Sequence, residues 1–252
     1  TNANAAATRR ALANLELLVV SDLFLNETAR EYAHVFLPAA SSFEKDGTFM
    51  NAERRVQRVR RALAPPGDAR ADWEILCDTA RRLGYAAQFE FTSAESIWDE
   101  VRAVWPQGAG MTYSRLESGG LQWPCPDVDH PGTTILHVAQ FPVGPRAALR
   151  RIEFHASAEQ VSDEFPFMLV TGRTLHQFNA GTMTGRTRTA LLRPTDTLDM
   201  TAEDAQRLGL ADGERVRVRS HYGAALLPLR ISAAQKPGEV FATFHDPRVF
   251  LN

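Results

Sequence analysis

Apolar and polar residues along this chain fall into blocks whose lengths and spacing predict its secondary structure. Residues 16–20, with LLVV at their centre, and residues 35–39 are short apolar runs that predict buried strands, and residues 27–33 between them favour a helix. A strand, a helix and a strand at this spacing predict a βαβ unit with parallel strands and a right-handed crossover. An Ala- and Arg-rich helix is expected before them, at residues 5–15.

The rest of the first half predicts one strand and two longer helices. Apolar and polar residues alternate at residues 56–59, whereas residues 72–83 and 96–104 have helical patterns, the first of them ended by Gly84. Residues 107–131 are rich in Gly, Pro and aromatic residues, which predicts a long loop that covers a site or links two domains.

Short strands dominate the second half. The candidates are residues 134–138, 151–155, 165–170, 215–220, 224–231 and 240–243, with one short helix after Thr201, whose side chain is a natural N-cap. Strands at this density predict a closed β-barrel.

Composition narrows the class of protein. The 252 residues are 44% apolar, enough for the cores of one large domain or two ordinary ones, and the formal net charge of −2 argues against a nucleic-acid or anionic-membrane partner. No apolar run approaches the length of a membrane span. Cys77 and Cys125 make neither a disulfide framework nor a zinc site, although a reactive role for Cys125 stays open. The chain begins with Thr, which favours a fragment or a processed chain.

A polar loop follows the apolar run at residues 165–170. It contains glycines, hydroxyl and amide side chains and several arginines, in the sequence TGRTLHQFNAGTMTGRT. Glycine permits close backbone approach to a ligand, and arginine binds phosphate through two nitrogens, so this loop is a candidate anion site. The alternative is a long solvated loop. His176 has no metal-ligating partners at useful spacing, and His245 is expected to be a loop residue.

Ligands of parallel sheets bind beyond the carboxyl ends of the strands, where Ser21 and Asp22 are predicted to lie. The Asp22 carboxylate there would accept two hydrogen bonds from the N1–H and N2–H₂ edge of guanine, but on the residues alone a helix-capping role is favoured. Asp72 is either an N-cap or a second guanine ligand. Lys45 either reaches a phosphate or ribose, or is solvated on a turn.

Six blocks along the chain resemble, in order and spacing, the C-terminal third of the catalytic subunit of molybdenum- or tungsten-dependent formate dehydrogenases, in the molybdopterin oxidoreductase (DMSO-reductase) family. They are LELLVVSDLFLNETA, LPAASSFEKDGTFMNAERRVQ, ADWEILCDTARRLGY, GLQWPCPD, FPFMLVTGRTLHQFNAGTMTGRT and TAEDAQRLGLADGERVRVRS. The resemblance implies an α/β Rossmann-like segment with a connecting loop at residues 1–131, followed by a double-psi β-barrel domain at residues 132–252 that binds a molybdopterin dinucleotide. GLQWPCPD favours formate dehydrogenase over nitrate reductase.

The resemblance implies bis(molybdopterin guanine dinucleotide) carrying Mo or W as cofactor, and it shifts the interpretation of Asp22 and Asp72 from capping to ligand contact. Phe244 falls at a substrate-channel position of a relative. The positions that match the cofactor contacts of the family are Ser21, Asp22, Lys45, Asp72, Thr171, Gly172, Arg173, Thr174, Leu175, His176, Gln177, Phe178, Asn179, Ala180, Thr182, Met183 and Asn252.

The metal-ligating Cys or selenocysteine of the family and its iron–sulfur motifs match nothing in this sequence, so neither a catalytic residue nor a metal ligand is expected in it. The expected partners are the N-terminal part of the catalytic subunit, iron–sulfur or flavin electron-transfer subunits, formate as substrate, and an acceptor such as NAD. A cytoplasmic location is expected, with the periplasm left open. Two alternatives remain: another molybdopterin oxidoreductase of nitrate reductase type, and a non-catalytic cofactor-binding or scaffold module.

Overall fold

The structure is a computed structural model that describes residues 4–246 and residue 249. The chain divides into two compact units, which are treated separately below. We call Leu17–Arg151 the N-terminal unit, and Ile152–Asn252 together with Thr1–Glu16 the C-terminal unit.

The N-terminal unit begins with the expected βαβ arrangement. β1 (Val19–Asp22) and β2 (Val35–Pro38) pair in parallel, with Val19 opposite Val35, and α2 (Glu27–Tyr32) connects them. The helix begins where it does because the Asn26 side chain accepts a hydrogen bond from the Ala29 N–H at 3.0 Å. The expectation of fully buried strands is wrong: Val19 is 47% and Val35 41% exposed, because this sheet has only two strands among the described residues.

The rest of this unit forms a second core. β3 (Gly47–Met50), β4 (Arg55–Val59) and β5 (Leu121–Gln122) make an antiparallel sheet, packed with α4 (Ala94–Val104) and α5 (Tyr113–Leu116), and α3 (Asp72–Arg82) follows β4. Buried Val56, Trp98, Met111 and Leu116 gather with Cys125, which is a core residue. Residues 107–131 are therefore not one loop: they contain α5, β5 and the 3₁₀ turn Pro106–Gly108 that starts one residue earlier.

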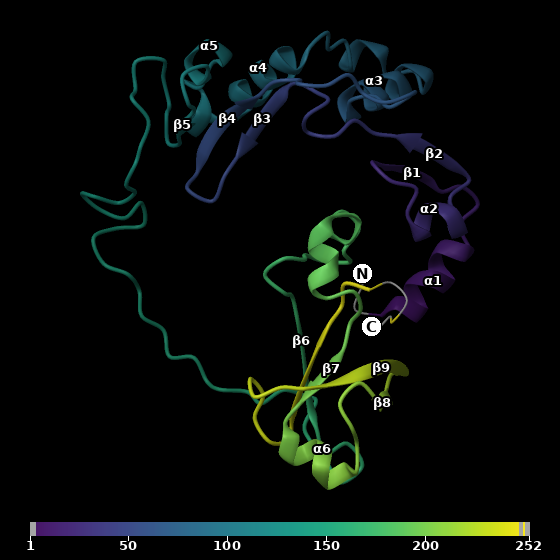
Figure 1. Ribbon diagram of the computed structural model, residues 1–252. Coiled ribbons are helices and arrows are strands. Elements are labelled where there is room, and N and C mark those ends of the chain that lie inside the picture. Colours follow the sequence, from purple (N-terminus) through teal and green to yellow (C-terminus); the bar gives the residue numbers. More distant parts are fainter. Residues whose placement is uncertain (1–3, 247–248, 250–252) are drawn as a thin grey trace. The chain divides into compact units, whose positions relative to one another are not determined.

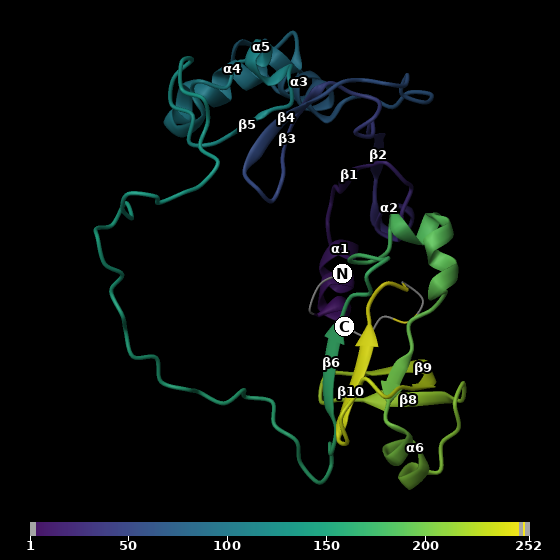
Figure 2. The same cartoon turned by 60° about the vertical axis from the view of Figure 1, so that its left-hand side comes forward.

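The C-terminal unit contains α1 (Ala5–Ala13) and one mixed sheet, drawn in Figures 1 and 2. The strand order is β6-β10-β7-β9-β8, and buried Leu198, Met200, Leu227, Leu229 and Ala242 form the core. Its elements are β6 (Met168–Gly172), two 3₁₀ turns (Thr184–Arg186 and Arg188–Leu192), β7 (Leu198–Met200), α6 (Ala202–Leu208), β8 (Arg215–Arg219), β9 (Ala224–Ile231) and β10 (Glu239–Thr243).

Two predicted strands are absent from the described structure. Residues 134–138 and 151–155 were predicted as short strands, but neither segment pairs with a strand, and Ile152 and Phe154 are each 90% exposed. Conversely, β3 and β7 were not predicted, and each forms because hydrogen bonds join it to neighbouring strands.

The pairing of β6 with β10 brings two loop segments to the same end of the sheet. These strands are parallel neighbours, with Gly172 opposite Thr243, and Figure 2 shows their arrows ending side by side. The chain segments that follow them, residues 173–181 and 244–246, therefore start at the same end of the sheet.

Candidate functional site

The loop that follows β6 is held to the segment that follows β10 by His245. The Thr174 N–H donates to His245 Nε2 at 3.1 Å, and His245 Nδ1 lies 2.6 Å from the Asn179 carbonyl oxygen. Both ends of residues 174–179 are thereby attached to one imidazole, whose residue is only 5% exposed. These two bonds tie the loop to the segment after β10, while Leu175 and Phe178 within it stay exposed to solvent.

Backbone conformation fits this loop closely. Gly181 has φ of +65°, and a Cβ placed on it would lie 2.7 Å from the His245 carbonyl oxygen. Asn179 also adopts a left-handed backbone, with φ of 47°. Glycine in this loop was expected to permit close approach of a ligand. Gly181 instead permits close approach of the His245 backbone of the same chain.

A buried carboxylate with two arginines lies next to the loop. Asp199, 1% exposed, accepts hydrogen bonds at 3.0 Å from both Arg193 Nη2 and Arg230 Nε, and pairs a second time with Arg230. Its hydrogen bonds to Arg230 raise the pKa of that guanidinium. Two guanidinium groups face one carboxylate, so the cluster keeps one positive charge in excess.

These elements enclose a pocket of about 480 Å³, which we call the arginine pocket. Three buried polar atoms on its lining residues have no hydrogen-bond partner within the described part of the chain: Thr174 Oγ1, His176 Nε2 and Arg193 Nε. Buried polar groups in folded proteins are nearly always paired, so these atoms indicate a bound polar group. The lining consists of Thr174, Leu175, His176, Leu192, Arg193, Pro194, Thr195, Thr197 and Arg230.

Only some of the residues between 171 and 183 that match cofactor contacts of the family line this pocket. Thr174, Leu175 and His176 do, whereas the buried Gln177 turns its amide to the Arg193 carbonyl at 3.3 Å. The remaining predicted residues of the run do not line the arginine pocket: Thr171, Gly172, Arg173, Phe178, Asn179, Ala180, Thr182 and Met183. Phe244 is half-buried with its ring 5.6 Å from that of His245, and Asn252 lies outside the described residues.

The charged residues next to this pocket were not predicted from the sequence. Arg193 and Asp199 follow the loop closely in sequence, whereas Arg230 is distant, and the fold brings both arginines to Asp199. One signal was available: Asp199 stands between Leu198 and Met200, and a carboxylate inside an apolar strand requires a cationic partner. His245 is a loop residue as expected, but its burial and its two bonds to the loop after β6 were not predicted.

In the N-terminal unit, Ser21 and Asp22 end β1 as predicted. The Ala39 N–H donates to the Asp22 carbonyl at 3.1 Å, and Ala39 forms a parallel bridge with Arg70, so the segment leading into α3 begins at the same edge. Asp22 does not cap α2: its carboxylate accepts from the Phe24 N–H at 3.2 Å and the Asn26 side chain at 2.7 Å, while Asn26 is the cap. The capping interpretation of Asp22 is therefore wrong.

Lys45 and Asp72 are brought together at the start of α3. They form an ion pair, so Lys45 is not a free solvated turn residue. The N-cap of α3 is Ala71, which makes no side-chain capping bond, so the N-cap interpretation of Asp72 is also wrong. Asp72 occupies the first helical position, with a half-exposed carboxylate.

Lys45 also lines a polar pocket of about 440 Å³ in the N-terminal unit. Arg58 and Tyr113 line it too, with the guanidinium 3.7 Å from the ring centroid, and the Arg58 Nε and Tyr113 hydroxyl are buried without partners in the described structure. Burial raises the pKa of Tyr113, and Arg58 partly opposes this. Asp22 and Arg173 both match cofactor contacts of the family but belong to different units, so their contact with one molecule stays a prediction.

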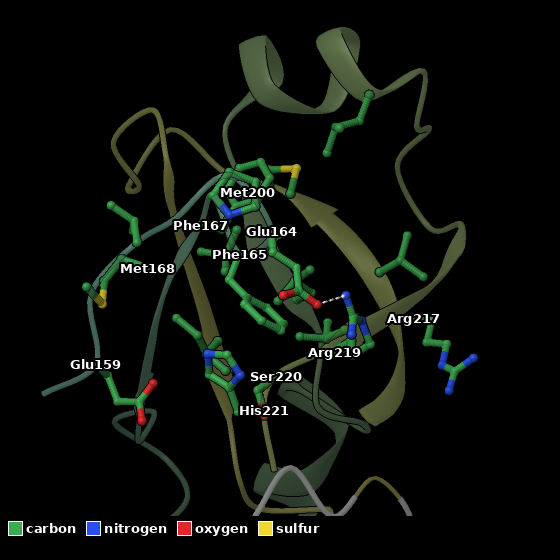
Figure 3. Close-up of a pocket in the computed structure, with 18 of the residues that line it drawn as sticks. Glu159, Glu164, Phe165, Phe167, Met168, Met200, Arg217, Arg219, Ser220 and His221 are labelled. Atoms are coloured by element: carbon green, nitrogen blue, oxygen red, sulfur yellow. Dashed lines mark hydrogen bonds and ion pairs between the residues drawn. The ribbon is translucent and has the colours of Figure 1, made fainter. Parts of the chain in front are cut away.

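A third pocket, of about 450 Å³, lies at the opposite ends of β6 and β10 (Figure 3). Apolar Leu198, Met200 and Val240 line it, while Arg219 bonds to Glu164 at 2.9 Å on its rim. Its lining has no buried unpaired polar atom in the part of the chain that is described, so it lacks the features of an anion site.

The described residues lack two further features. No cluster of three or more His, Cys, Asp or Glu side chains there is arranged to hold a metal ion. Within the same residues, no helix has the length and apolar character needed to cross a membrane.

Two family models match the chain. Molybdopterin oxidoreductase matches residues 1–82, and the model described as Molydopterin dinucleotide binding domain matches residues 167–251. The second match contains the glycine-rich loop, Arg193, Asp199, Arg230 and His245.

Curated relatives are similar along nearly the whole chain. The F420-dependent formate dehydrogenase subunit alpha of Methanocaldococcus jannaschii is 41% identical, covering 96% of this chain and 37% of the relative. The assimilatory nitrate reductase catalytic subunit of Bacillus subtilis is 35% identical, covering 96% of this chain and 35% of the relative. The chain thus spans about a third of the length of these relatives. Acetylene hydratase from Pelobacter acetylenicus has the same fold over 95% of this chain and 34% of its own, with a TM-score of 0.70 at 20% identity.

Proposed function

We propose that the chain is the C-terminal part of a formate dehydrogenase catalytic subunit of the molybdopterin oxidoreductase family, and that it holds the nucleotide arms of bis(molybdopterin guanine dinucleotide), with Mo or W. When bound, that group exchanges electrons with the substrate at its metal, which in this proposal is formate oxidised to CO₂. The residues of this chain bind and orient the group. No residue of this segment is assigned a catalytic role.

The arginine pocket is the observation that carries the proposal. A pyrophosphate is an anion rich in hydrogen-bond acceptors, and the pocket has two arginines that share the Asp199 carboxylate, with unpaired donors at Thr174 and Arg193. His176 Nε2 supplies a third polar contact. In this proposal the neighbouring predicted residues, with Arg173 foremost, contact the pterin and phosphates as the loop passes over them.

Guanine recognition is proposed for the N-terminal unit. Asp22 and the Lys45–Asp72 pair follow strand ends that share one edge, which supports nucleotide contacts there. A carboxylate selects guanine over adenine because adenine lacks the N1–H and N2–H₂ donors.

Thr174→Val in the complete catalytic subunit tests the phosphate assignment. The hydroxyl has no partner to lose within the described protein, so the substitution should leave the unfolding midpoint of the cofactor-free protein unchanged or raised. Retention of the cofactor, measured as GMP released by acid per polypeptide, should fall by roughly tenfold on dilution. Thr28→Val, an exposed change on α2, is the control. Unchanged GMP retention in Thr174→Val would remove this assignment.

Asp22→Asn tests the guanine assignment by the same GMP measurement. We expect reduced cofactor retention without unfolding. Asn26→Ala is the control, because it removes the α2 cap that Asp22 also supports but leaves the Asp22 carboxylate in place. Equal losses in both variants would mean that Asp22 acts through α2 and not on guanine.

Two alternative functions make different predictions. A nitrate reductase, supported by the Bacillus relative, would show nitrate reduction and no formate oxidation in the complete complex. A scaffold module that keeps the fold without the cofactor would contain neither phosphorus nor Mo or W after purification.

The finer fold and the partners belong to the same proposal. The parallel β1–β2 pair with its bridge at Arg70 supports a Rossmann-like sheet, and β10 between parallel β6 and antiparallel β7 supports a double-psi β-barrel. The proposed domain boundary near residue 131 precedes the point at which the two compact units divide, after Arg151. The proposed partners are the N-terminal part of the subunit, which would carry the metal ligand and iron–sulfur motifs, and cytoplasmic electron-transfer subunits. These would determine whether the acceptor is NAD or, as in the F420-dependent relatives, F420.

A further inference from the structure

His245 uses both of its ring nitrogens on the binding loop. Nε2 faces the Thr174 N–H, which only donates, and Nδ1 faces the Asn179 carbonyl oxygen, which only accepts. A neutral imidazole has one donor nitrogen and one acceptor nitrogen. Both contacts are therefore satisfied by a single form of the side chain, the neutral tautomer with its proton on Nδ1.

The backbone that carries the His245 imidazole is held by a buried carboxylate. The Asp196 carboxylate, which is 2% exposed, accepts hydrogen bonds from the His245 N–H at 3.1 Å, from the Asp246 N–H at 2.9 Å and from the Thr243 hydroxyl. These bonds hold the backbone at the end of β10, so the ring projects from a rigid base. The Gly181 backbone packs against the His245 carbonyl and admits no side chain between them.

We propose that His245 is the positioning residue of the binding loop: it fixes the distance between Thr174 and Asn179 and thereby aims Thr174 Oγ1 and His176 Nε2 at the ligand of the arginine pocket. The identity of that ligand rests on the proposed function, whereas the fixation of the loop does not. His245 touches the loop on both sides and is absent from the lining of the pocket, so it acts through Thr174 and His176.

The tautomer is measured on the unmodified chain. ¹⁵N-edited NMR of the ring nitrogens should show the His245 proton on Nδ1, and a scalar coupling should connect Nε2 with the Thr174 amide. A proton on Nε2 would overturn the proposal, whatever the cofactor content of the sample.

Variants then separate positioning from packing. His245→Phe keeps the ring and loses both bonds, so the Thr174 amide should exchange with deuterium roughly tenfold faster, while amides of β7 keep their protection. His245→Gln retains one donor and one acceptor and should restore part of the protection. Equal exchange at Thr174 in the Phe and Gln variants would contradict positioning. If His245→Phe also loses β7 protection, it has unfolded, and the tautomer measurement decides.

The same variants in the complete subunit connect the loop with the ligand. GMP retention should fall in His245→Phe and recover partly in His245→Gln. If the unmodified subunit contains no GMP while the tautomer and exchange results hold, the proposed function fails and the fixation of the loop stands. If GMP is present and both variants retain it as the unmodified subunit does, positioning toward the ligand is refuted.

Discussion

At the scale of residues, the site depends on charges buried deeply enough that each needs its partner. Asp199 is inaccessible to water and lies between Leu198 and Met200 of the core. A carboxylate there persists only because Arg193 and Arg230 bond to it and the Thr197 hydroxyl donates to it at 2.6 Å. The same contacts leave the cluster positive, so the interaction that stabilises the sheet also prepares the pocket for an anion.

Asp199→Asn should therefore be among the most destabilising single changes in the C-terminal unit. It keeps the volume but removes the charge, and Arg193 is left buried without its counter-ion, which costs about 3–5 kcal/mol. Urea unfolding followed by a probe in this unit measures the effect. Arg230→Gln is the matched control: Arg230 is half-exposed and Asp199 keeps Arg193, so a loss of at most about 1 kcal/mol is expected. Equal losses of stability in the two variants would contradict the view that Asp199 is needed mainly by the buried Arg193.

Asp204 predicts a pH dependence of stability. Its carboxylate bonds to Arg207 at 2.6 Å, the Gly238 N–H at 2.8 Å and the Thr201 hydroxyl at 3.0 Å, and these bonds, with Arg207 foremost, hold its pKa below the usual value. A folded pKa below the unfolded one stabilises the protein above the unfolded value, about 4, and the stabilisation is lost as the pH falls through the folded pKa.

Asp204→Asn should accordingly be less stable than the unmodified protein at pH 7, and the difference should shrink as the pH falls below about 4. Thermal unfolding of both proteins between pH 3 and pH 7 measures it. Glu203→Gln, on the exposed side of the same first turn of α6, is the control and should show no such convergence. A difference that stays constant with pH would mean that the Asp204 charge does not contribute.

At the scale of elements, the sequence identified those whose own residues encode them. The βαβ unit, α3, α4, α6 and the long strands β8 and β9 were predicted, because periodicity and capping residues such as Thr201 are local signals. Residues 134–138 and 151–155 are rich enough in apolar residues to predict strands, but they have no neighbouring strand to pair with. β7 has a neighbouring strand on each side, but Asp199 interrupts its apolar residues, so its sequence does not resemble a buried strand.

The residues of the candidate site likewise divide into those with a local sequence signal and those without one. Thr174 and His176 were predicted from a local glycine- and hydroxyl-rich loop. Arg193, Arg230 and His245 were not, because their roles arise from the strand order that places β7, β9 and β10 together. No spacing in the sequence encodes that order.

The loop between β6 and β7 offers a test at this scale. Gly181→Ala should destabilise it by about 2 kcal/mol or more, from its left-handed backbone and from contact with the His245 carbonyl. Gly209→Ala has a similar φ of +67° with open space, and Gly185→Ala has open space without positive φ. Urea unfolding should rank the losses as Gly181, then Gly209, then Gly185. If Gly181→Ala costs no more than Gly209→Ala, the close approach to His245 is not a constraint.

At the scale of the whole molecule, the two units differ in how completely they bury their own strands. The five-stranded sheet of the C-terminal unit encloses fully buried Leu227 and Ala242, whereas β1 and β2 form a two-stranded parallel sheet with Val19 and Val35 exposed. Parallel sheets are normally buried on both faces, and two strands alone are marginally stable. The relatives are nearly three times as long as the part that this chain covers, so they contain further chain available to cover this sheet.

Hydrogen exchange of this chain alone and within the complete subunit should therefore differ by unit. Alone, the amides of β1 and β2 should exchange close to the unprotected rate, and those of β7 and β9 should be strongly protected. In the complete subunit, protection of β1 and β2 should rise by at least tenfold, with little change in β7 and β9. The βαβ unit carries Asp22, so this result would place the proposed guanine ligand on the unit that depends on its partner, and the arginine pocket, proposed to bind phosphate, on the unit that does not. Strong protection of β1 in the chain alone would contradict that division, because the strand would then need no further covering.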